Sequence, residues 1–95
     1  MLENLEDARA VKAERRRYLR ELRAGRYYTY LVLQEPPSCI RTMTMMDFIL
    51  NVPRREQWVW NEAMHEIGVR PAARVGDLPR WQRVAFTAIL VERGL

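Results

Sequence analysis

Apolar residues in the first quarter of the chain recur at helical spacing and predict one long N-terminal helix. Side chains three or four residues apart lie on the same face of a helix, and Arg15 interrupts the apolar series here. Asn4 suits the N-cap, and Gly25 suits the stop because glycine tolerates positive φ. The buried seam predicted for this helix consists of Leu5, Ala8, Val11, Tyr18 and Leu22.

The pattern between residues 52 and 86 predicts two helices separated by two tight turns. A helix over residues 56–67 should end at Gly68, and turn-forming residues fill the short connection that follows. Pro79 suits the start of a second helix, expected over residues 80–93, where the missing N–H of proline costs nothing. This last helix is apolar on most sides, which predicts the central core element of a small bundle.

Basic charge is concentrated in the N-terminal helix. The 95-residue chain carries a net charge of +4, whereas residues 9–26 alone hold eight basic side chains against two acidic ones. All but one of the sixteen basic residues are arginines, which a genome rich in G and C would also favour, and arginine makes bidentate contacts to phosphate. The basic face, either a solvated surface or a second phosphate-tracking surface, is formed by Arg9, Lys12, Arg16, Arg20 and Arg23.

Arginines also surround the two turns. The start of a helix presents unpaired N–H groups and the positive end of the helix dipole, so arginines beside it favour an anion. We expect Arg74, Arg80 and Arg83 to point at one phosphate. The complete set of phosphate contacts predicted for this part of the chain is Arg54, Arg55, Arg70, Arg74, Arg80 and Arg83.

Several short runs along the chain share their spacing with one known family. AMHEIGV at residues 63–69, RV at 74–75, Leu78 and QR at 82–83 follow the pair VP at 52–53. Upstream, LE at 5–6, ARA at 8–10, RRR at 15–17 and LRAG at 22–25 belong to an Arg-rich helix. These runs resemble the actinobacterial integration host factor family, whose members are helix–two-turns–helix DNA-binding proteins. The resemblance covers roughly residues 5–25 and 43–90.

The chain departs from that family at two turns. Residues 54–56 stand where the family has a Gly-rich turn, and Asp77 and Pro79 stand where it has glycines around a leucine. Side-chain arginines are therefore expected to replace part of the close backbone approach to phosphate. The resemblance implies an architectural, nucleoid-associated protein that binds the phosphates of double-stranded DNA with little sequence preference. It leaves open whether the gene is chromosomal or belongs to a phage or other mobile element.

Residues 26–34 favour a strand by propensity, because they contain three tyrosines, a threonine and a valine. A lone strand needs a partner, and no other segment offers one. The family resemblance favours a short helix capped by Thr29 instead, and this is our prediction.

A second short helix is predicted over residues 45–51, after the break at residues 36–38. Thr44 suits its N-cap and Asp47 its third position, as in a weak capping box. The methionines around its start are expected to fill the core, with a Met-rich partner surface as the alternative: Met43, Met45 and Met46.

The sequence lacks the patterns that usually carry catalysis. It has no paired-carboxylate site, Gly-rich nucleotide loop, His/Cys cluster or serine motif that we can place. We therefore expect a non-enzymatic binding protein without a cofactor or metal. The alternative to DNA binding is a protein-interaction factor that binds or inhibits a host protein through Trp58, the methionines and the apolar last helix; RNA binding is a weaker third reading.

These patterns together predict an all-α fold. Residues 1–25 form a basic N-terminal helix, an arm of the same domain, and residues 26–95 form a helix–two-turns–helix bundle. The chain is expected to be monomeric and to lie at the nucleoid in the bacterial cytoplasm. The single cysteine, Cys39, fits a reducing compartment, and no apolar run approaches the ~18 residues that span a membrane.

Overall fold

The protein is all-α, as predicted. The computed structural model describes the backbone of residues 2–95 and the side chains of residues 9–95. Within that range its only β-type pairing is an isolated bridge between Thr44 and Arg74. The helices are α1 (Leu2–Arg23), α2 (Thr29–Gln34), α3 (Ser38–Arg41), α4 (Met45–Leu50), η1 (Arg54–Glu56), α5 (Gln57–Ile67), η2 (Val75–Asp77) and α6 (Arg80–Glu92).

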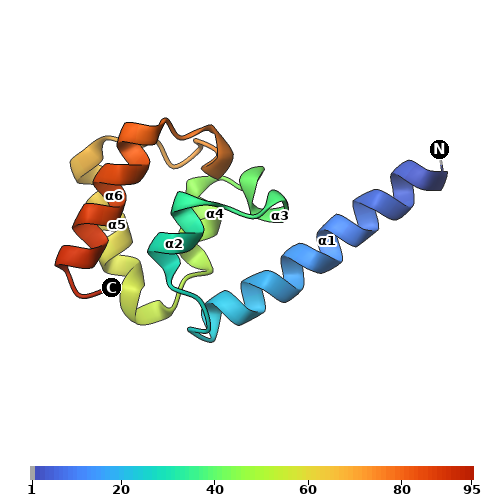
Figure 1. Cartoon of the computed structure of the whole chain (residues 1–95), viewed down its shortest axis with the longest axis horizontal. Helices are drawn as coiled ribbons and strands as arrows, with labels where there is room; N and C mark the ends of the chain where they lie inside the picture. The colour runs from blue at the N-terminus through green and yellow to red at the C-terminus, as the bar shows by residue number, and fades with distance from the viewer. Residues whose placement is uncertain (1) are drawn as a thin grey trace.

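Helix α1 projects from the bundle of the other helices, and only its C-terminal half lies against them (Figure 1). Leu22 is fully buried, and Tyr18 and Leu19 pack against the core beside it. The predicted seam residues Leu5 and Ala8 lie outside the described side chains. Val11 is exposed, so the prediction that it belongs to the buried seam is wrong. Because α1 already begins at Leu2, Asn4 lies inside the helix, so the prediction that it forms the N-cap is wrong.

The core is centred on Trp60 of α5. Its ring lies 5.3 Å from that of Phe48 on α4 and 5.6 Å from that of Phe86 on α6, measured between centroids. All three rings are completely buried. Such aromatic contacts add about 0.5–1.5 kcal/mol each to the free energy gained by burial itself. These contacts pack α4 and α6 against α5, and α5 and α6 are the helices on either side of the two-turn connection.

Helix α6 packs closely on α2 and α5, but it is not enclosed on most sides as was expected of a central core element. Only Phe86 and Leu90 are buried in it. It packs on α5 and α2 with that side, and four apolar residues on its other side face outward. A helix that is mostly apolar by sequence can therefore still expose one face, and those exposed positions are Trp81, Val84, Ala88 and Val91.

Residues 26–34 contain a helix, as predicted, but Thr29 does not cap it. The N-cap position is Tyr28, and Thr29 is the first helical residue. Its hydroxyl donates a buried 2.7 Å hydrogen bond to the Glu56 carboxylate. Thr29 therefore fastens α2 to η1, because a buried carboxylate needs a donor. The next helix, α3, begins after Pro37 and was not predicted.

The two-turn connection after α5 is held by backbone hydrogen bonds to the start of α4. Helix α5 ends at Gly68, whose φ of 79° is the left-handed conformation predicted for the stop. Farther on, the carbonyls of Pro71 and Ala73 accept hydrogen bonds from the Met46 and Met45 amides at 3.0 and 2.7 Å. These are amides of the first turn of α4, which have no partner within their own helix. Thr44 caps the same helix by accepting from the Asp47 amide, as predicted.

Candidate nucleic-acid interface

Two arginines from distant parts of the chain meet at Thr42, the residue that follows α3. Arg15 of α1 donates from Nη2 to the Thr42 hydroxyl and from Nε to the Cys39 carbonyl, both at 2.6 Å. Arg74, which precedes η2, donates from Nη1 to the Thr42 carbonyl, also at 2.6 Å. Together with Arg41, which precedes Thr42 in the chain, they form what we call the Thr42 arginine cluster: Arg15, Arg41 and Arg74.

Close packing between α3 and η2 fixes the position of Arg41 in this cluster. A Cβ added at Gly76 would lie 2.9 Å from both the Cβ and the carbonyl oxygen of Arg41. Only glycine leaves room for that approach, so Gly76 is required by space and not by its φ. The Arg41 side chain lies over its own helix and donates from Nε to the Pro36 carbonyl at 3.3 Å.

No carboxylate in the part of the chain with described side chains forms an ion pair with the Thr42 arginine cluster. Among the side chains of residues 9–95, the ion pairs are Arg26–Glu21 at 3.0 Å and Arg93–Glu62 at 2.7 Å, and neither involves the cluster. Each cluster guanidinium bonds instead to neutral oxygens. Several like charges held close together without counter-charges create a positive potential that attracts anions.

The predicted basic face of α1 is exposed and continues from the cluster. Successive residues of an α-helix turn by about 100°. The five residues of the basic face therefore fall within an arc of about 80°, which begins beside Arg15. Glu14 and Glu21 lie on the opposite flank of the helix by the same reasoning. We call the exposed basic side the α1 basic flank, formed by Arg9, Lys12, Arg16, Arg20 and Arg23.

Arg83 is half-buried and bonds to backbone carbonyls of the domain, although it also borders a surface depression. Its guanidinium donates to three carbonyls, those of Leu33 and Val75 at 2.6 Å and that of Leu78 at 3.1 Å. Burial, and to a smaller extent the neighbouring charge of Arg41, lowers the pKa of Arg83. Arginine begins so high that the group stays charged at neutral pH. Arg83 therefore ties α6 to α2 and η2, and the N–H groups that make these bonds are not free for a phosphate.

Two of the three arginines expected to share one phosphate lie beside each other. Arg80 is exposed and lines a surface depression together with Arg83 and Glu35. Arg83 also bonds to backbone carbonyls, and Arg74 bonds to Thr42. Of the other predicted contacts, Arg54, Arg55 and Arg70 are exposed, and Nη2 of Arg55 lies 3.9 Å from the position of a Cβ at Gly25.

Arg15 and Arg41 were not among the predicted contacts. The signal for Arg15 was present in the sequence, because a charged residue that interrupts an apolar seam must find polar partners on the buried side. Arg41 gave no comparable signal, since its place in the cluster depends on Gly76, thirty-five residues away.

The aromatic and sulfur side chains divide between core and surface. Met43 and Met45 are buried, as expected of core residues, whereas Met46 is exposed. Trp58 is 57% exposed. Trp81 is 63% exposed and was not singled out from the sequence.

Cys39 is buried under α1 and is not a reactive thiol. Burial is the main cause that raises the pKa of Cys39, and the Glu14 carboxylate adds to it. A thiol with a raised pKa stays protonated and is a poor nucleophile. Within the described residues no group of three or more His, Cys, Asp and Glu side chains could hold a metal ion. None of the described helices is both long and apolar enough to cross a bilayer.

Comparison of the chain with models of protein families, with curated proteins and with solved structures finds no match.

Proposed function

We propose that this protein is a non-enzymatic, architectural DNA-binding protein that holds the phosphates of double-stranded DNA with little regard to sequence. The observation that carries the proposal is the Thr42 arginine cluster, in which Arg15 and Arg74 both bond to Thr42, Arg41 is its neighbour in the chain, and no carboxylate of residues 9–95 forms an ion pair with them. A phosphate diester is the abundant cellular anion that such forked donors suit best. The α1 basic flank extends this surface by a further five charges.

The cluster is also held in a fixed arrangement before any ligand binds. Arg15 and Arg74 each donate one guanidinium N–H to Thr42, and these bonds orient the remaining N–H groups. Fixing these side chains in advance lowers the conformational entropy lost on binding. The bonds of Arg15 also set the direction of α1, which at 22 residues is about 33 Å long. Duplex DNA presents a charge every ~1.7 Å along its axis, so a helix of this length can follow several phosphates.

Contacts of this kind position a protein on DNA without identifying bases. We therefore infer a nucleoid-associated role in the bacterial cytoplasm, in keeping with the resemblance to the actinobacterial integration host factor family. No cofactor is required for such binding. The exposed arginines Arg54, Arg55, Arg70 and Arg80 would add to the general attraction.

A salt-titrated gel shift with unrelated duplexes of equal length tests this proposal. Each neutralised phosphate should lower log K by about 0.9 per unit of log[salt]. All duplexes should bind within about 100-fold of one another, below the ~10³-fold or greater preference of specific binding. A larger preference, or binding that does not weaken with salt, would refute recognition through phosphates alone.

A second candidate function is binding of a host protein through Trp58. It is supported by the exposure of this tryptophan, since large aromatic side chains on a surface often mark contacts. Two variants distinguish DNA binding from binding of a host protein. If replacing Arg41 and Arg74 with alanine leaves DNA binding intact while Trp58→Ala abolishes a biological effect, the protein-partner function replaces DNA binding.

A further inference from the structure

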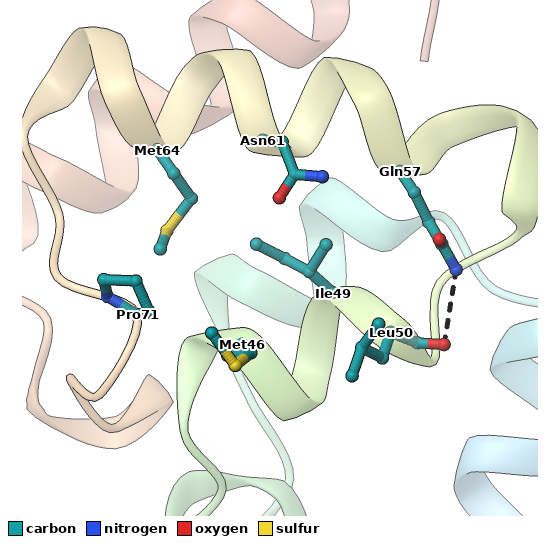
Figure 2. A pocket seen from close by; sticks show the side chains of 7 residues that line it. All are labelled: Met46, Ile49, Leu50, Gln57, Asn61, Met64 and Pro71. Carbon is teal, nitrogen blue, oxygen red and sulfur yellow. Dashed lines mark hydrogen bonds between the residues drawn. The ribbon is translucent and has the colours of Figure 1, made fainter.

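A groove of about 270 Å³ opens between α4 and α5 (Figure 2). Its walls include the apolar side chains of Met46, Leu50, Met64 and Pro71, and the amides of Gln57 and Asn61 stand along α5. Met46 and Leu50 are 53% and 61% exposed, so apolar surface is open to solvent. The volume is slightly below the ~300 Å³ at which small-molecule sites begin, and it suits one or two side chains of a protein.

A ridge of apolar side chains runs along the outer face of α6. Trp81, Val84, Ala88 and Val91 are spaced by three, four and three residues, so they share one face of the helix. The face spans ten residues, or about 15 Å. A surface helix normally buries its apolar stripe, yet α6 already buries Phe86 and Leu90 on its other side. This α6 ridge is therefore a second apolar surface, and it has no partner among the described residues of the chain.

We propose that the α6 ridge of one copy docks into the α4–α5 groove of a second copy. The ridge cannot enter the groove of its own chain, because α6 packs on α5 and α2 through its opposite side. An apolar helix face in an apolar groove is a common mode of recognition between proteins. The chain thus carries both halves of one interface, a convex half on α6 and a concave half between α4 and α5.

Charges at the ends of the α6 ridge and of the groove are complementary, and they favour one direction of the ridge in the groove. Arg80 begins the ridge, and Glu92 ends it. In the groove, Met46 and Met64 lie at one end, where Asp47 follows Met46, and Leu50 and Gln57 lie at the other (Figure 2). Arg54 precedes Gln57 by one turn at that second end. Docking with Arg80 toward Asp47 and Glu92 toward Arg54 brings opposite charges together, and all four side chains are exposed.

Because the two halves are different surfaces, the contact is heterologous. Such contacts generate rings or open chains of subunits rather than closed two-fold dimers. This differs from the monomer expected from the sequence. The association does not depend on the proposed DNA binding, so the two are tested separately.

Sedimentation velocity without DNA, over a series of protein concentrations, tests the proposal by complementation. The parent should gain mass as its concentration rises. Trp81→Glu, which disables the ridge, and Leu50→Glu, which disables the groove, should each remain monomeric. An equimolar mixture of the two should form a dimer and nothing larger, because one intact ridge and one intact groove remain. Trp58→Glu, at a similarly exposed tryptophan outside both surfaces, should associate like the parent.

A parent that stays monomeric at every concentration would overturn the proposal. A mixture of the two variants that stays monomeric while the parent associates would overturn it as well, because another surface would then be in use. Circular dichroism checks that each variant is folded. Should either be unfolded, Val84→Glu and Met46→Glu replace them, since they alter the same two surfaces at other exposed side chains.

Discussion

Arg15 and Thr42 lie twenty-seven residues apart in sequence, and the Arg15 guanidinium donates a 2.6 Å hydrogen bond to the Thr42 hydroxyl. With the second bond, from Nε to the Cys39 carbonyl, this side chain joins α1 to α3 and the residue after it. The α1 basic flank is thereby held at a fixed angle to the rest of the molecule. Without these bonds, α1 would be attached only through Leu22 and its neighbours. With them, the α1 basic flank and the Thr42 arginine cluster form one surface.

Replacement of Arg15 by methionine should therefore destabilise the fold. The variant loses both hydrogen bonds of the guanidinium, each worth about 0.5–1.5 kcal/mol net, so we expect a loss of about 1–3 kcal/mol in the free energy of unfolding. Urea denaturation monitored by circular dichroism measures this loss in the free energy of unfolding. Arg17→Met is the matched control, because Arg17 is exposed on the same helix. Equal stabilities of the two variants would show that Arg15 does not fasten α1.

Arg83 and Arg80 should behave differently although they lie one turn apart in α6. Arg83→Gln leaves the buried carbonyls of Leu33 and Val75 without their donors. Each such group costs about 1–3 kcal/mol, so the variant should lose at least about 2 kcal/mol of stability. Arg80→Gln removes the same charge from an exposed position and should change stability by less than about 0.5 kcal/mol. Thermal unfolding distinguishes them, and a stable Arg83→Gln variant would argue against the structural role of Arg83.

Gly76→Ala should weaken both stability and DNA binding. The added Cβ would lie 2.9 Å from the Arg41 backbone oxygen, so η2 and α3 must move apart. Overpacking of this kind costs about 1–3 kcal/mol and should displace Arg41 relative to Arg74. Gly68→Ala is the control: its Cβ meets no atom within 4 Å, and its cost of about 1–2 kcal/mol comes only from the positive φ. Affinity for a duplex should fall for Gly76→Ala and stay unchanged for Gly68→Ala; equal affinities would contradict the role of α3–η2 packing.

Loss of charge from the α1 basic flank should affect binding without affecting folding. Replacing Arg16, Arg20 and Arg23 with glutamine should change the free energy of unfolding by less than about 0.5 kcal/mol, since all three are exposed. If each contacts one phosphate, the slope of log K against log[salt] should flatten by about 2.7. A second triple variant lowers the net charge equally at exposed arginines away from the flank: Arg17, Arg26 and Arg93. Identical slopes for the two triple variants would mean that only total charge matters.

Features set by local sequence were predictable, and features set by distant contacts were not. The Gly68 stop and the Thr44 cap depend on residues within one turn, and both were confirmed. Thr29 suited a cap equally well, but its hydroxyl is taken by Glu56, twenty-seven residues away. The composition of α6 indicated burial on most sides, whereas a chain of 95 residues has too few elements to cover every face of it.

In the candidate site, too, features set by local sequence were predictable and features set by distant contacts were not. Exposed basic positions on α1 could be predicted because they depend only on helical periodicity. The bonding of Arg83 to backbone carbonyls could not, because its partner Leu33 lies fifty residues away. Nothing local distinguishes an arginine that binds carbonyls from one that faces solvent.

The most direct test of the account is the affinity of a variant with alanine at Arg41 and Arg74 for a labelled duplex, measured by fluorescence anisotropy across a salt series. Circular dichroism should first show a folded chain, since both side chains are exposed. Because the cluster is proposed to hold phosphates, affinity should fall by a similar factor for every duplex, and the salt slope should flatten by about 1.8 for two lost contacts. Affinity and salt slope equal to those of the parent would contradict the proposal that the Thr42 arginine cluster binds DNA.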